Sequence, residues 1–222
     1  MTAASRTRGY ARRGVAAKAR ESNARERILE AACDLIASDG IDDVRIARVA
    51  NRARASTALV HHYFSTREEL LEQALLHSFE TAGAERFAEN PDAEPTAARG
   101  LARAVETSLP LPGAQERDWT LWVELWLRAA REPALRPLAA DLYRRYRTWM
   151  AAAIDAGLES GEFSSEHSAE EIADVAIALL DGAGIRALIR DPATDIERAR
   201  AIVLGYLAAE LGIEPSALEL AP

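Results

Sequence analysis

The sequence holds one cysteine, Cys33, and one lysine, Lys18, among 222 residues. A single cysteine excludes an internal disulfide and a thiolate metal cluster, and it suits a reducing cytosol. No apolar run approaches the roughly 20 residues that a membrane helix needs, so we expect a cytoplasmic protein without a membrane partner. No stretch shows the period-2 alternation of β-branched residues that is typical of strands. These absences predict an all-α protein.

Periodic apolar residues predict nine helices and no internal repeat. Asn23, Thr66, Ser168 and Thr194 are each followed three residues later by glutamate, which predicts a capping box at four helix starts. Pro133 predicts the first turn of a long helix. The expected helices cover about 23–39, 45–51, 56–62, 66–90, 96–108, 118–131, 133–159, 168–190 and 194–212.

Charge is distributed unevenly along the chain. Residues 1–66 carry 12 basic against 7 acidic side chains, a net of +5, whereas the remainder carries a net of −13. A basic N-terminal part, residues 1–66, followed by an acidic remainder is expected where the N-terminal part binds a polyanion. The alternative is a chance fluctuation of charge.

These features divide the chain into four parts. Residues 1–20 contain six basic residues and no acid, and they predict a disordered basic arm that either reaches along DNA or makes no contact. A secretion signal is disfavoured because no apolar segment follows Arg12 and Arg13. We then expect a helix-turn-helix domain over 21–66, a ligand-binding and dimerisation domain over 67–212, and a tail over 213–222.

The segment ARVANRARASTALVHHYFSTREELL, residues 47–71, predicts two short helices joined by a tight turn. Val49 and Ala50 lie on the inner face of the first helix, Ala53 to Ala55 form the turn, and Ser56 is the expected N-cap of the second. This arrangement is typical of the helix-turn-helix unit, whose second helix fits the major groove of double-stranded DNA.

The longer block RERILEAACDLIASDGIDDVRIARVANRARASTALVHHYFSTREELL resembles the N-terminal domain of the tetracycline-repressor (TetR) family. Arg54 stands where the family usually has the turn glycine, Arg45 where a Ser or Thr often caps the helix, and His61 where a phosphate-contacting Tyr is common. Arginine is sterically poorer than glycine if the turn needs positive φ, so a slightly altered turn is expected. The residues expected at the DNA are Arg45, Arg54, Ser56, Thr57, Ala58, His61, His62, Tyr63 and Arg67.

Other chemistry finds little support in the sequence. His61 and His62 are adjacent on a helix and do not face each other, so no metal site is expected. Cys33 lies within the first helix, where a packing role is favoured over redox sensing. No nucleophile–base pair or glycine-rich phosphate loop occurs, so we expect neither an enzyme nor a cofactor.

The acidic body contains an aromatic stripe. Trp119, Trp122 and Trp126 fall on one helix face within about 60°. They are either ordinary core or the lining of a pocket for a flat apolar ligand or an amine cation. Asp181, inside an apolar helix, is either an interface residue or a polar anchor of that pocket. The full set of pocket candidates is Trp119, Trp122, Trp126, Tyr143, Tyr146, Trp149 and Asp181.

The last two predicted helices are apolar over a wide face. A helix-turn-helix regulator needs two copies for a two-fold operator, so these helices are expected to form a homodimer interface, as the family resemblance also implies. The expected interface residues are Val175, Leu179, Ala183, Leu188, Val203, Tyr206 and Leu207.

Residues 118–191, with the segments DWTLWVELW and REPALRPLAADLYRRYRTWM, resemble the C-terminal domain of the BetI-type branch, which implies a small cationic effector. We therefore expect a dimeric regulator, most simply a repressor, that binds a palindromic operator and is released by a small molecule. The alternative is a DNA-binding protein of the same fold without an effector, which a body packed solid around the tryptophans would favour.

Overall fold

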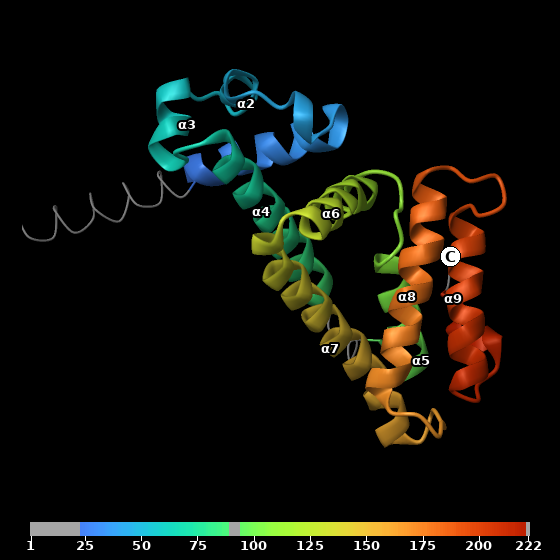
Figure 1. Cartoon of the computed structure of the whole chain (residues 1–222). Coiled ribbons are helices and arrows are strands. Elements are labelled where there is room, and N and C mark those ends of the chain that lie inside the picture. Colours follow the sequence, from blue (N-terminus) through green and yellow to red (C-terminus); the bar gives the residue numbers. More distant parts are fainter. Residues whose placement is uncertain (1–22, 89–93, 221–222) are drawn as a thin grey trace, which may run out of the picture. The chain divides into compact units, whose positions relative to one another are not determined.

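The computed structural model describes residues 23–88 and 94–220 (Figure 1). The predicted arm over 1–20 lies outside these described residues. The described chain forms nine α-helices and no strand, which confirms the predicted all-α fold. None of its helices is both long enough and apolar enough to cross a membrane. The helices are 23–39, α2 (Ile46–Arg52), α3 (Thr57–Tyr63), α4 (Arg67–Ala88), α5 (Ala97–Thr107), α6 (Ala114–Arg131), α7 (Arg136–Ser160), α8 (Ala169–Leu188) and α9 (Ile196–Glu210).

Three of the predicted capping residues, Ser56, Thr66 and Ser168, cap their helices. Ser168 and Glu171 form the complete reciprocal capping box at α8. Thr66 Oγ1 accepts a hydrogen bond from the backbone N–H of Glu69 at 3.0 Å. The prediction for Thr194 was wrong, because Asp195, one residue later, accepts from the backbone of Arg198 and caps α9.

Helices α6 and α7 differ from their predicted starts. Helix α6 begins four residues earlier than expected, directly after Gly113, whose φ of 106° is a conformation that favours glycine. Pro133 opens a short 3-10 turn (Pro133–Leu135), and α7 begins only at Arg136. Glu132 is extended, as a residue before proline usually is, so it ends α6.

The chain divides into two compact units between Ser78 and Phe79. In the first unit, Ile28 and Ile36 of the first helix are buried, as predicted, together with Val49 and Val60. The first three turns of α4 contribute leucines to the same core. The unit is thus a small helical domain that supports α2 and α3.

The second unit contains helices α5 to α9. Helix α8 lies between α7 and α9, and α5 packs against both α7 and α9 (Figure 1). Its core includes Met150 and Ile154 of α7, Leu180 of α8 and Val203 of α9. The buried indole of Trp119 lies against Gly184 of α8, and its Nε1–H donates to the backbone oxygen of Ser108 at 3.0 Å.

The contact between Trp119 and Gly184 predicts a strong effect of one methyl group. A Cβ at position 184 would lie 2.3 Å from the Trp119 ring, so we expect Gly184→Ala to destabilise the protein by about 1–3 kcal/mol. Gly182→Ala is the same change at a position where a Cβ meets no atom of this subunit within 4 Å, so it should not destabilise the single subunit. Thermal unfolding measures both, and equal melting temperatures for Gly184→Ala and wild type would contradict the packing argument.

Candidate DNA interface and effector site

The helix-turn-helix has the predicted local structure. Ser56 caps α3, because its hydroxyl accepts a hydrogen bond from the backbone N–H of Leu59 at 3.1 Å. Val49 and Ala50 of α2 and Val60 of α3 are buried between the helices. The inner faces are therefore fixed by packing, which leaves the opposite face of α3 for DNA.

The outer face of α3 is exposed and carries short side chains. Thr57, Ala58, His61 and His62 are all exposed, whereas Tyr63 is half-buried with its ring edge-on to that of His62, 5.1 Å between centroids. Hydroxyl, methyl and imidazole groups can contact base edges or phosphates in a major groove. The placement is compatible with the roles expected for these residues.

Two arginines of α2 are held by aspartates of the preceding helix. Arg48 forms an ion pair with Asp39 at 2.5 Å, and Arg52 forms one with Asp34 at 2.9 Å. About half of each arginine side chain remains exposed, so these pairs contribute little to stability. Their main effect is to balance positive charge on the side of α2.

Arg45 and Arg67 are bound to backbone carbonyls. Arg45 donates to the oxygen of Asp42 at 2.6 Å. The guanidinium of Arg67, the first residue of α4, donates to the oxygens of Val44 at 2.7 Å and Ile41 at 2.5 Å. Arg67 thus ties α4 to the turn before α2 and positions the motif.

Arg54 lies in the turn between α2 and α3 and is exposed. Its φ is 52°, in the left-handed region. The turn therefore does need a positive φ at this position, and arginine adopts it although glycine takes it more readily.

In the second unit, the three tryptophans of α6 form the centre of an aromatic cluster. Trp119 and Trp122 are buried and Trp126 is half-buried, and their ring centroids lie 5.9 to 6.5 Å apart. Tyr143 stacks on Trp126 at 5.5 Å, while Trp122 lies 6.5 Å from Tyr146. Tyr146 in turn stacks on Trp149 at 6.0 Å. The cluster brings all six predicted aromatic residues together.

Phe79 of α4 belongs to the same cluster, with its ring centroid 5.6 Å from that of Trp122. Sequence reasoning missed this residue. It lies 40 positions before Trp119, and only tertiary packing brings it to the tryptophans. A helix-period pattern within α4 would have marked it merely as buried.

Asp181 of α8 adds a carboxylate beside the aromatic rings. The Tyr143 hydroxyl donates a hydrogen bond to Asp181 Oδ2 at 2.7 Å. Burial raises the pKa of Asp181 to about 6, against the lowering effect of the Tyr143 hydrogen bond. Burial also raises the pKa of Tyr143, so the phenol stays protonated. A half-buried carboxylate beside stacked rings is suited to bind an organic cation.

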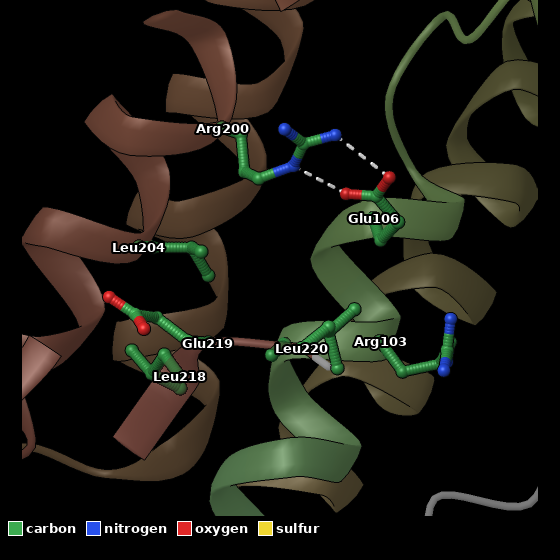
Figure 2. Close-up of a pocket in the computed structure, with 8 residues that line it drawn as sticks. Arg103, Glu106, Arg200, Leu204, Leu218, Glu219 and Leu220 are labelled. Carbon is green, nitrogen blue, oxygen red and sulfur yellow. Dashed lines mark hydrogen bonds and ion pairs between the residues drawn. The ribbon is translucent and has the colours of Figure 1, made fainter. Parts of the chain in front are cut away.

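A separate cavity of about 450 Å³ lies between α5, α9 and the C-terminal segment (Figure 2). Arg200 of α9 donates two hydrogen bonds to the carboxylate of Glu106 on α5, at 2.5 and 2.8 Å. Leu204, Leu218 and Leu220 supply apolar surface. No sequence pattern predicts this cavity, because three segments far apart in the chain line it. Because Arg200 and Glu106 neutralise each other, the pair serves first to join α5 to α9.

The predicted interface residues divide into two groups. Ala183, Val203 and Leu207 are buried in this subunit's own core and face inward. Val175 is 44% exposed, and three further residues are half-buried. The half-buried residues are Leu179, Leu188 and Tyr206.

Two family models match the chain. Residues 28–74 match the model of the tetR family of bacterial regulatory proteins, and residues 97–212 match the BetI-type transcriptional repressor C-terminal domain. The chain belongs to the TetR family of transcriptional regulators, which are DNA-binding proteins and not enzymes. Within that family, its C-terminal domain is of the BetI type.

Individual relatives agree with this assignment. The chain is 26% identical over 193 residues to the HTH-type transcriptional regulator BetI of Brucella canis, covering 87% of this chain and 94% of the relative. A transcriptional regulator from Saccharomonospora viridis, solved in complex with choline, is 32% identical with a TM-score of 0.76, covering 84% and 96%. A TetR-family regulator from Rhodococcus is 28% identical with a TM-score of 0.72, covering 86% and 99%.

Proposed function

We propose that this TetR-family regulator is a homodimeric, cytoplasmic repressor that binds a palindromic operator and is released by a small quaternary ammonium compound such as choline. The observation that carries the effector class is the carboxylate of Asp181, which accepts a hydrogen bond from Tyr143, whose ring stacks on that of Trp126. Rings supply cation–π attraction and the carboxylate supplies the opposite charge, the two features that recognise a quaternary ammonium group. The choline bound to the Saccharomonospora relative supports the same class.

DNA binding is assigned to the exposed face of α3. Thr57, Ala58 and His61 are the candidates for base contacts, with Ser56, His62 and Tyr63 beside them. Arg45 and Arg67 are assigned to hold the motif in position, because their guanidinium groups are engaged with backbone carbonyls. In this assignment, the short side chains of α3 contact base edges in the major groove. Arg45 and Arg67 hold the helix-turn-helix in the orientation in which α3 enters the groove.

The dimer is proposed to form through α8 and α9. Three of the five large apolar side chains that are exposed in the described chain, Val175, Ile185 and Ile189, belong to α8 or its C-cap. Gly182 and Gly205 face open space, although glycine weakens a helix interior. Apolar residues separated by small ones allow close approach of a second copy.

Release requires two conformations of the dimer that differ in the separation of the DNA-binding units. The effector must bind one conformation more tightly than the other, since equal affinity would not shift the equilibrium between them. Helix α4 is the candidate conduit. Arg67 fixes its first turn to the turn before α2, and Phe79 packs on Trp122 of the aromatic cluster. A cation that rearranged the tryptophans would therefore act directly on a residue of α4.

The test combines selection of genomic fragments by the purified protein with release by choline. We expect an inverted repeat to be recovered, and we expect choline to dissociate it, whereas the neutral isostere 3,3-dimethyl-1-butanol should not at equal concentration. Binding without a shared sequence would contradict the operator proposal. Release by both compounds, or by neither, would contradict the cationic effector class.

A further inference from the structure

The turn between α2 and α3 holds its residue in a conformation that side chains disfavour. Arg54 has φ 52°, and the only other non-glycine residue with positive φ in the described chain is Arg190, with φ 58°. In this region the Cβ of an L-residue is crowded by the backbone, whereas glycine is free of that conflict. Arginine at position 54 therefore lowers the stability of the turn, which suggests a compensating use of its side chain.

The guanidinium of Arg54 differs from those of the neighbouring arginines in having no partner among the described residues. Every other arginine between positions 45 and 67 is bound to an aspartate or to a backbone carbonyl, as described above. The backbone N–H of Arg54 donates to the oxygen of Asn51 at 3.1 Å, but its guanidinium makes no hydrogen bond or ion pair with the described residues, and its side chain is exposed. The most strained arginine of the motif is thus also the one whose charge is free.

The position of Arg54 places this free charge next to the DNA-facing helix. It precedes Ser56, the N-cap of α3, by two residues, and Thr57 and Ala58 on the next turn are exposed. When a recognition helix lies in the major groove, the residues flanking it approach the sugar–phosphate backbone. A guanidinium group binds phosphate with two parallel hydrogen bonds and does not lose its charge.

We propose that Arg54 is a phosphate-binding residue, whose guanidinium contacts the DNA backbone beside the groove that α3 enters. The proposal rests on operator binding through α3. It adds a contact that raises DNA affinity, while the positive φ of Arg54 lowers the stability of the turn. Because phosphates carry no sequence information, this contact strengthens binding to all DNA and increases its dependence on salt.

The experiment compares Arg54→Gly with Arg190→Gly in the full-length protein. Both variants relieve the same backbone conflict, so we expect both melting temperatures to rise by about 1–3 °C. Only Arg54→Gly is expected to weaken operator binding, by about fivefold to tenfold at roughly 0.1 M salt. The slope of log affinity against log salt concentration should become shallower by about 0.9, the value for one phosphate contact. Fluorescence anisotropy titrations at several salt concentrations measure these quantities.

Arg54→Lys separates charge from backbone conformation. It keeps the positive charge in the same turn, so we expect it to retain the wild-type salt slope with a modest loss of affinity. Wild-type affinity and slope in Arg54→Gly would overturn the proposal, as would an equal loss in Arg190→Gly. Loss on the operator but not on random DNA would indicate a base contact and would also overturn it.

The same titrations distinguish failure of this inference from failure of the proposed operator binding. If the wild-type protein binds every sequence equally, the operator proposal fails. The salt slope on random DNA still decides whether Arg54 contacts phosphate, because that term is independent of sequence.

Discussion

Asp181→Asn is expected to weaken choline binding about tenfold or more at pH 7.5, because it removes the carboxylate bound to Tyr143 while keeping the side-chain shape. The fold should not suffer, since an amide oxygen can still accept the Tyr143 hydrogen bond and the cost of burying a charge is lost. Isothermal titration measures the affinity. Asp174→Asn is the matched control on α8, because Asp174 is exposed and pairs only with Arg147.

The pH dependence of choline binding provides a second test of the same carboxylate. With its pKa raised to about 6, Asp181 is ionised at pH 7.5 and largely protonated at pH 5. Choline keeps its charge throughout, so the affinity should be constant above about pH 7 and should fall, approaching tenfold per unit, below pH 6. Asp181→Asn should show no such fall. A wild-type affinity that stays constant to pH 5 would exclude Asp181 as the counter-ion.

The pH dependence that Asp181 gives to protein stability has the opposite sign to the pH dependence of choline binding. A carboxyl group whose folded-state pKa is raised binds its proton more tightly in the folded state, so its contribution to folding is lost as the pH rises from about 4 to 6. Ligand affinity should therefore rise over a pH range in which the contribution of Asp181 to the stability of the free protein declines. The site is built for binding rather than for stability.

Ile185→Arg is expected to separate the dimer and to reduce operator affinity by about a hundredfold or more. Ile185 is 36% exposed on α8, so the arginine fits the single subunit, but burying its charge against a second copy is costly. Losing the dimer removes one recognition helix from the operator. Sedimentation and anisotropy titrations measure the two effects.

Leu127→Arg is the control for this prediction, because Leu127 is 47% exposed on α6, outside α8 and α9. It should leave both the dimer and the affinity intact. A dimer that persists in Ile185→Arg, or that dissociates equally in Leu127→Arg, would contradict the α8–α9 interface.

The helices were predictable where local chemistry decides them. Ser56 and Ser168 cap their helices as expected, because a hydroxyl at an N-cap satisfies backbone donors whatever lies elsewhere in the chain. Thr194 failed because its neighbour Asp195 offers a better acceptor, and a choice between adjacent caps depends on small differences in chain direction.

The sites were less predictable than the helices. The stripe of Trp119, Trp122 and Trp126 was visible from helical spacing, and Asp181 from its place inside an apolar helix. Phe79 was not, because it comes from α4 and only packing brings it to Trp122. Equally, helical spacing could not decide which apolar positions of α9 face inward, since Val203 and Leu207 are apolar like the residues on the free face. Long-range packing settles such choices.

The pairing of Arg48 and Arg52 with aspartates has a consequence for how the protein distributes itself on a chromosome. Residues 23–78 carry seven arginines against nine acidic residues, a net charge of −2, so the basic excess of the first 66 residues stems from positions before 23. Because residues 23–78 carry no net positive charge, the negative potential of DNA contributes little to the affinity of this part of the chain. Attraction to the very numerous unrelated sites that compete with an operator then depends on the basic residues before position 23 and on Arg54, and not on the net charge of residues 23–78.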